Sequence, residues 1–138
     1  MRVEQRLDYV LRALVVLATL PPGTGAPAGR VADQLGLPRR FVEQQLTALG
    51  KRGIVVAQRG PGGGSALARP ADEISVADVV VALHGEVLDV PRVAGSAVSE
   101  MWSRVAGTLA TELSQVTLAD LSARQLELDE VEAYVYHI

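Results

Sequence analysis

This chain of 138 residues contains no cysteine, two histidines, one tryptophan, three tyrosines and one phenylalanine. The absence of cysteine excludes disulfides, thiol nucleophiles and thiolate metal centres. Neither histidine has a serine and an acid near it in the arrangement of a hydrolase triad, and no Lys-Ser/Thr pair follows the glycine run 60–64, as a P-loop requires. His84 with Glu86 and Asp89 combines metal-ligand types, but such sets are common on surfaces. We therefore expect no enzyme, no metal site and no cofactor.

Long apolar runs are also absent. No segment approaches the roughly 18 apolar residues that span a bilayer. Asp8 and Arg12 interrupt the first apolar region, which excludes a signal peptide. The hydrophobic content of 49% is typical of a folded chain. We expect a cytoplasmic protein without a membrane partner, built as one compact unit or as a small domain with an appended arm.

The overall formal charge of −3 conceals an uneven distribution. Residues 1–70 carry ten basic and four acidic side chains, a net charge of +6, whereas residues 71–138 carry three basic and twelve acidic side chains, a net charge of −9. A basic half next to an acidic half indicates a polyanion as the partner of the basic half. Double-stranded DNA is the polyanion that the local patterns below favour.

The patterns of residues 1–70 predict a winged helix-turn-helix. Apolar residues at helical spacing predict a first helix that ends before Pro21, a short helix over 28–35 and a third helix from Pro38 to Arg52. Two β-prone runs, 54–58 and 65–68, flank the glycine-rich turn 59–64 and predict a β-hairpin wing. We therefore expect a mainly α-helical protein with a small hairpin wing after a helix-turn-helix.

The second half of the chain predicts a dimerisation helix. Ser75–Asp78 and Thr117–Asp120 are capping-box patterns, the first opening a fourth helix and the second a short last helix. Between them, a loop over 85–95 precedes an apolar stripe that is too long for the core of one small subunit and therefore predicts a homodimer. We expect a DNA-binding domain over 1–83 and a loop, dimerisation helix and tail over 84–138. The stripe and expected dimer interface comprise Val98, Met101, Trp102, Val105, Leu109 and Leu113.

The third predicted helix and the wing supply the expected DNA contacts. Glu43 is either a solvated acid or an acceptor for cytosine N4, and Gln44 can pair with adenine. Phe41 has two alternative roles: it packs in the core, or it contacts a thymine methyl group or a sugar. The arginines of the third helix are expected to contact phosphate or guanine, and the wing is expected to contact phosphate or the minor groove. The expected DNA-binding residues are Arg2, Arg39, Arg40, Phe41, Glu43, Gln44, Arg59, Gly60, Pro61 and Gly62.

Several segments in order resemble the Rrf2 family of bacterial transcription regulators, over about residues 1–121. The resemblance implies a homodimer with a long crossing helix and a palindromic DNA site. Many members bind an iron–sulfur cluster through three cysteines after the fourth helix, whereas residues 89–99 of this chain contain none. Ser65 also replaces an aromatic residue of the family. The resembling segments are 9–14, 41–44, 51–55, 59–64, 67–70, 73–79, Trp102 and 117–121.

Together these patterns predict a sequence-specific, DNA-binding transcription regulator, a repressor that acts as a homodimer without an iron–sulfur cluster. The alternative is a protein–protein adaptor that uses the winged-helix fold without DNA. The basic side chains Arg39, Arg40 and Arg59 discriminate between them, because an adaptor has no need to group these charges. The sequence leaves the effector open: a small molecule bound near residues 84–99, a partner protein, or none.

Overall fold

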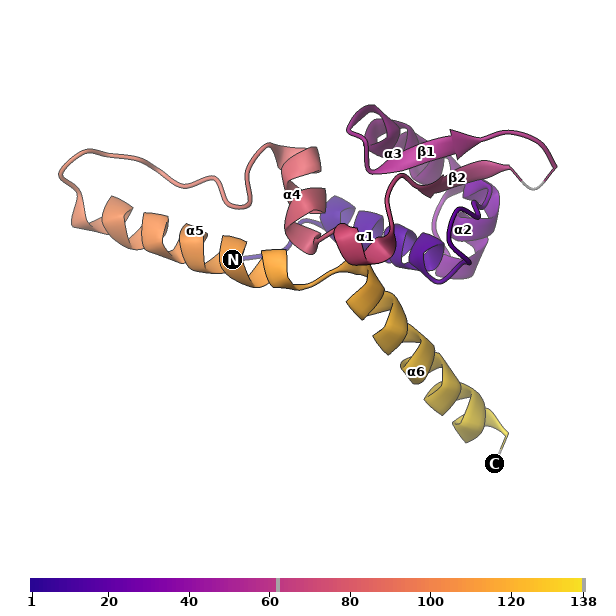
Figure 1. Ribbon diagram of the computed structural model, residues 1–138. Helices are drawn as coiled ribbons and strands as arrows, with labels where there is room; N and C mark the ends of the chain where they lie inside the picture. The colour runs from indigo at the N-terminus through magenta and orange to yellow at the C-terminus, as the bar shows by residue number, and fades with distance from the viewer. Residues whose placement is uncertain (62, 138) are drawn as a thin grey trace.

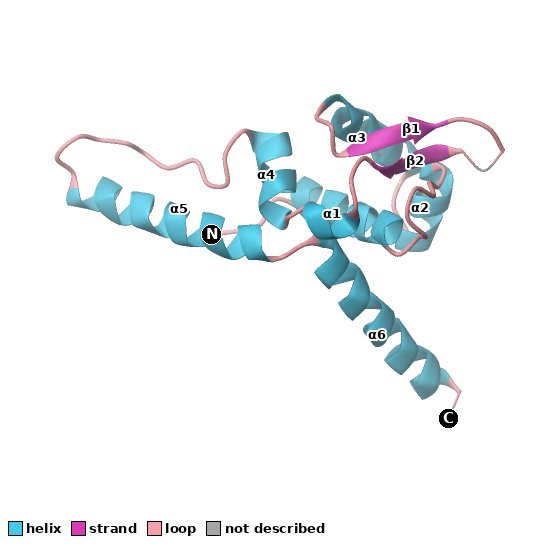
Figure 2. Ribbon diagram, viewed as in Figure 1, coloured by secondary structure: helices cyan, strands magenta, loops and turns pink. Residues whose placement is uncertain are grey.

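The computed structural model describes residues 1–61 and 63–137, and in that part of the chain helices dominate around one small hairpin (Figures 1 and 2). No helix among these residues is long and apolar enough to cross a membrane. The elements are α1 Gln5–Ala18, α2 Ala28–Leu35, α3 Arg39–Lys51, β1 Val55–Gln58, β2 Gly64–Leu67, the 3-10 helix η1 Ala71–Glu73, α4 Val76–His84, α5 Ala97–Gln115 and α6 Leu118–Tyr136.

Helices α2 and α3 form the predicted helix-turn-helix. Gly36 ends α2 in the left-handed conformation, with φ of 67°, and the Leu37 amide then donates to the Ala32 carbonyl at 2.9 Å. This closing pattern suits glycine, which has no Cβ to oppose a positive φ. Pro38 caps the start of α3, where its missing N–H costs no hydrogen bond. The turn therefore needs only three residues, 36–38, to redirect the chain between the helices.

The core of the N-terminal half is formed by one apolar face from each element. Leu14 of α1, Leu49 of α3 and Ile74 after η1 are fully buried in one cluster. Leu118, the first residue of α6, belongs to the same cluster and is also fully buried. Its amide donates to the Ile74 carbonyl at 2.9 Å. The start of α6 is thus fixed to the winged domain, across the predicted boundary at residues 83 and 84, a boundary that stays a prediction.

The wing is anchored to the helix-turn-helix by a third segment of backbone. Strands β1 and β2 pair antiparallel, with Val55 opposite Leu67 and Gln58 opposite Gly64. Ala26, just before α2, bridges Ser65 of β2 through two backbone hydrogen bonds of 2.9 and 3.0 Å. A Cβ at Gly64 would lie 2.2 Å from the Ala26 carbonyl oxygen, so this close approach requires glycine.

Both predicted capping boxes are present. The Ser75 hydroxyl accepts from the Asp78 amide at the start of α4, and the Thr117 hydroxyl accepts from the Asp120 amide at the start of α6. Residues 85–96 form the expected loop between α4 and α5. The expectation of a short last helix was wrong, because α6 has 19 residues and includes most of the tail. Figure 1 shows α5 and α6 extending in different directions from the base of the winged domain.

Candidate nucleic-acid interface

One face of α3 is polar and exposed. The apolar residues Val42, Leu46 and Leu49 are buried against the core, and their spacing of three and four residues leaves the other side of the helix free. The exposed side chains on that free side are Arg40, Glu43, Gln44, Thr47 and Lys51. Figure 1 places α3 beside the wing, at the end of the molecule opposite the free end of α5. An exposed polar helix next to a hairpin is the arrangement with which winged helices read a major groove.

Arg39 and Glu43 form an ion pair on this face. Arg39 Nε donates to Glu43 Oε1 at 2.9 Å, with side-chain exposures of 73% and 49%. The Arg39 guanidinium also lies over Gly29 of α2, where an added Cβ would come within 3.5 Å of it. The carboxylate that we expected at a base edge therefore holds an arginine in the free protein. We had not expected this pair, although a spacing of four residues on one helix places the two side chains next to each other.

The start of α3 carries positive charge where a helix least favours it. Arg39 and Arg40 occupy its first turn, which contains no acid. The unpaired N–H groups there give a helix N-terminus partial positive charge, so a cation costs about 0.3–1 kcal/mol and an anion is stabilised. Two arginines at this point are unfavourable for α3 alone and favourable beside a phosphate.

Phe41 lies on the core side of α3. Its half-buried ring packs against the core cluster and meets the ring of Tyr9 edge-on, with centroids 5.9 Å apart and planes at 85°. Arg6 Nε of α1 donates to Gln45 Oε1 of α3 at 2.7 Å on the same side. Of the two roles considered for Phe41, this position favours the packing role. A DNA contact by Phe41 stays a prediction.

The predicted wing residues follow β1 directly. Arg59, Gly60 and Pro61 are exposed, whereas Gly62 lies outside the described residues. Gly60 has φ of 97°, and the Gly63 amide donates to its carbonyl at 2.9 Å, which closes the turn. The side-chain amide of Gln58 hydrogen-bonds the Gly23 carbonyl and ties β1 to the loop before α2. The wing therefore has a fixed base from which Arg59 projects.

A groove of about 640 Å³ separates α3 from the wing. Glu43, Thr47 and Lys51 line its helix side at intervals of four residues, while Val56 and Ser65 line its strand side. Thr47 and Val56 are exposed and were not among the predicted contacts. The interval of four from Glu43 was the signal that could have identified Thr47.

The remaining basic residues divide into paired and exposed groups. Asp8 hydrogen-bonds Arg12 at 2.8 Å and raises the pKa of that guanidinium through this bond and its charge. Arg2 lies exposed before α1. Among the described residues, Arg2, Arg40 and Arg59 form no ion pair within 4.0 Å, which leaves their charges free for an external anion.

The predicted dimer residues lie along α5. Val98 is 61% exposed, and Met101, Trp102, Val105, Leu109 and Leu113 are half-buried within the single chain. Ser99 is the buried residue of this helix, and its hydroxyl accepts from the Val93 amide of the preceding loop at 3.1 Å. One side of α5 is therefore covered by its own chain while an apolar side stays open.

The loop before α5 does not provide the donors of an iron–sulfur cluster. His84 Nε2 lies 3.4 Å from a Glu4 carboxylate oxygen, and Arg92 donates to Glu86 at 3.1 Å. The residues that the structure describes include no group of three metal-ligating side chains, and the sequence has no cysteine. Because clusters of this kind require thiolate ligands, the residues present do not fit such a group.

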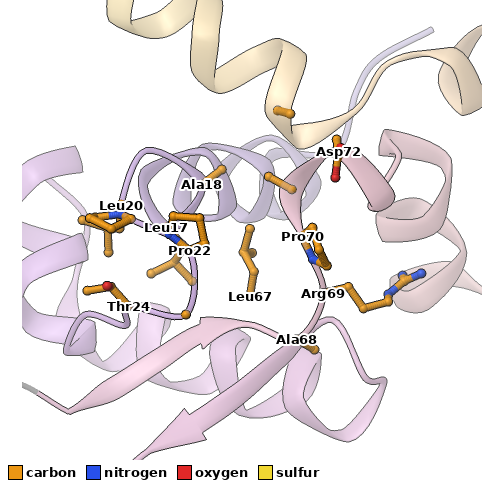
Figure 3. A pocket seen from close by; sticks show the side chains of 14 residues that line it. Leu17, Ala18, Leu20, Pro22, Thr24, Leu67, Ala68, Arg69, Pro70 and Asp72 are labelled. Atoms are coloured by element: carbon orange, nitrogen blue, oxygen red, sulfur yellow. The ribbon is translucent and has the colours of Figure 1, made fainter.

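A second cavity, of about 510 Å³, lies where the wing domain meets α6 (Figure 3). The lining residues are Leu17 near the end of α1, Leu20 just after that helix, Leu67 and Pro70 at and after the end of β2, and Ala119 of α6. It is mainly apolar and lies away from residues 84–99, where a ligand pocket had been considered. Its walls come from both the wing strand and the last helix.

Comparison with known proteins agrees with this geometry. Residues 3–124 match the Rrf2 family, which is described as an iron-dependent transcriptional regulator. A Mycobacterium tuberculosis protein named as an HTH-type transcriptional regulator is 32% identical over 135 residues, which cover 91% of this chain and 84% of that protein. CymR, the global cysteine regulator of B. subtilis, has a TM-score of 0.80 at 25% identity, covering 90% of this chain and 98% of CymR. IscR of T. potens has a TM-score of 0.78 at 26% identity, covering 91% and 88%. The winged helix-turn-helix and the family resemblance are confirmed.

Proposed function

Because the chain belongs to the Rrf2 family of transcriptional regulators, we propose that it is a homodimeric repressor that reads a palindromic operator and needs no iron–sulfur cluster. The observation that carries the proposal is the exposed polar face of α3 beside an anchored wing. In this proposal α3 enters the major groove and the wing reaches phosphate or the minor groove. A two-fold dimer then contacts two half-sites.

The roles of individual residues follow from their positions. Arg40 and Arg39 neutralise phosphate or bind guanine at the start of α3, where an anion is favourable. Glu43 and Gln44 read base edges from the middle of the exposed face. Arg59 contacts the backbone or a narrow minor groove at the wing, and Arg2 adds a phosphate contact. Gly60 and Pro61 belong to the turn of the wing, and a DNA contact by Gly62 stays a prediction.

The homodimer is supported by the open apolar side of α5. Val98 is 61% exposed in the single chain and the rest of the apolar row is only half-buried, so a helix of 19 residues leaves apolar surface for a partner to cover. A matching helix from a second copy supplies such a surface without any further protein.

Regulation without a cluster is supported by the composition. The family description includes iron, yet this chain has no cysteine with which to ligate a cluster. The repressor role is supported by the absence, among the described residues, of any folded unit beyond the winged domain and the two long helices. A dimer that only occupies DNA represses by excluding other proteins from that site.

DNA titrations with Arg40→Ala and Arg124→Ala test the proposal. Both substitutions remove one exposed arginine, but Arg124 lies on the acidic α6, where it pairs with Glu127 at 2.8 Å. Arg40→Ala is expected to weaken binding to every duplex and to lower the salt slope by about 1, as for one lost phosphate contact. Arg124→Ala is expected to bind as the wild type does. Equal behaviour of the two variants, or no binding of duplex DNA at low salt, would favour the adaptor alternative.

A further inference from the structure

The cavity of Figure 3 is bordered by three segments whose backbones are fixed by hydrogen bonds. The Thr24 amide donates to the Pro21 carbonyl at 3.0 Å and closes the turn after α1. The Glu73 amide donates to the Pro70 carbonyl at 2.9 Å and forms η1 after the exit of β2. The start of α6 is fixed by the backbone bond of Leu118 described above. The volume of about 510 Å³ is therefore preformed, and it lies within the range of roughly 300–1,000 Å³ that is typical of small-molecule sites.

Short or rigid side chains leave this volume unfilled. Ala18 of α1, Ala71 of η1 and Ala119 of α6 line the cavity and are half-buried. Pro21 and Pro22 line it as well, and their rings fix the backbone and cannot rotate into the space. Among the described residues no side chain fills the cavity, so its apolar walls would be stabilised by an apolar occupant that displaces water.

The polar side chains that border the cavity lie at its rim. Thr24, Arg69 and Asp72 are the lining residues with polar side chains, and all three are exposed. Figure 3 shows the Arg69 side chain extending away from the cavity, and its Nη2 lies 3.9 Å from a carboxylate oxygen of Asp78 in α4. A charged group inside the cavity would lose water without gaining a partner, which is costly. The walls therefore favour an uncharged molecule.

We infer that this cavity is a binding site for one small, uncharged, mainly apolar molecule of about the size of a two-ring aromatic compound. The site lies away from residues 84–99, and no residue of α3 lines it. It is thus separate from the proposed DNA-binding face, and its occupation can be measured without DNA.

The position of the site connects it to both strands of the wing. Gly23 lines the cavity, and its carbonyl accepts from the side-chain amide of Gln58 in β1. Leu67 ends β2 and lies between Pro22 and Pro70 in Figure 3. An occupant therefore contacts the segments that hold each wing strand in place. The site is the effector site of the regulator, a role that rests on the proposed function, and its occupation is expected to change operator affinity about fivefold or more.

Titration with N-phenyl-1-naphthylamine, an uncharged apolar fluorophore, tests the site in the absence of DNA. Its fluorescence is expected to rise and to saturate at about one molecule per subunit, with a dissociation constant on the order of 10 µM. Competition then tests the chemical class. 1-Naphthol is expected to displace the fluorophore at a concentration about tenfold lower than 1-naphthoate requires, because the carboxylate of 1-naphthoate would be desolvated without a partner.

Filling the cavity from two different walls locates the bound fluorophore. Ala119→Phe and Ala71→Phe each place a ring in the volume, and each is expected to weaken binding of the fluorophore about tenfold or more. Ala133→Phe is the matched control, because it adds the same side chain to an exposed position of α6 that does not line the cavity. This control is expected to bind as the wild type does. Circular dichroism shows whether each variant has retained its helices, and the two filling variants test the site independently of each other.

The outcomes separate the site from its effector role. Absence of saturable binding below about 100 µM overturns the site, as does equal binding by the wild type and the filling variants. Equal or better competition by 1-naphthoate overturns the chemical class. If 1-naphthol saturates the site and leaves the operator dissociation constant unchanged, the effector role is wrong. A protein that binds no duplex DNA overturns the proposed function, and the fluorophore titration still tests the site.

Discussion

The ion pair between Arg39 and Glu43 permits a quantitative test of how α3 reads DNA. The pair joins exposed side chains at positions i and i+4, with the base before the acid, which is the weaker order on a helix. Its contribution to stability is about 0.3–0.5 kcal/mol. A well-made base contact contributes about 1–3 kcal/mol of discrimination. Because the contact outweighs the pair, Glu43 is expected to exchange Arg39 for cytosine N4 on binding.

The perturbations are Glu43→Ala, Arg39→Ala and the double variant. Glu43→Ala is expected to change operator affinity little, because loss of a carboxylate near phosphates offsets loss of the contact. It should nevertheless reduce the preference at one base pair per half-site by about 1–3 kcal/mol. Arg39→Ala is expected to weaken binding to all duplexes and to lower the salt slope by about 1. In the double variant the loss of preference should persist in full.

The assay is a titration of each variant against the operator and its single-base variants at fixed salt. Glu127→Ala is the matched control, because it removes an exposed carboxylate that pairs with Arg124 on α6. The reasoning is refuted if Glu43→Ala keeps the wild-type preference at every position. It is also refuted if the effect of Glu43→Ala disappears in the Arg39→Ala background, since Glu43 would then act only by positioning Arg39.

Four further outcomes are expected. Gly64→Ala should lower the free energy of unfolding by about 3 kcal/mol in urea titrations, because the new Cβ clashes with Ala26 and breaks its bridge to Ser65. Gly60→Ala is the control: Gly60 has a positive φ, but an added Cβ meets nothing within 4 Å, so this variant should lose only about 1 kcal/mol. In the Leu109→Arg background, which is designed to remove the proposed dimer, Gly107→Ala should raise the melting temperature, since within one chain its Cβ meets nothing within 4 Å and alanine gains about 0.5–1 kcal/mol over glycine in a helix; a lower melting temperature would contradict this. Leu109→Arg should yield monomers by light scattering, because it places a charge in the proposed interface. The protein purified without oxygen should lack visible absorption and stoichiometric iron and sulfide, and its DNA binding should not respond to nitric oxide.

Local patterns in the sequence determined most of the elements. The bounds of α2 and α3 follow from Gly36, Pro38 and the spacing of buried residues, all of which act within one or two helical turns. The capping boxes that open α4 and α6 are interactions between residues three apart, so they too could be read directly. The position of the wing could be predicted from its glycine-rich turn between two short β-prone runs.

The tertiary structure decided the features that depend on distant segments. The bridge between Ala26 and Ser65, and with it the need for glycine at position 64, joins residues about forty apart and has no periodic signal. The edge-on contact of Tyr9 with Phe41 also joins residues far apart in the sequence, and it places the Phe41 ring on the core side of α3. Helix α6 continues through the tail although most of its length has no buried face, so apolar periodicity could not predict its end.

The sequence therefore determined which segments are helix, turn and wing, because those choices are made by neighbouring residues through caps, glycine and apolar spacing. Only the tertiary structure decided which polar side chains are free. It tied Arg6 to Gln45, which lies 39 residues further along the chain, and left Arg40 without an ion pair among the described residues. A charge in a sequence has no fixed partner until folding sets its distance from the others, and electrostatic interactions depend on that distance.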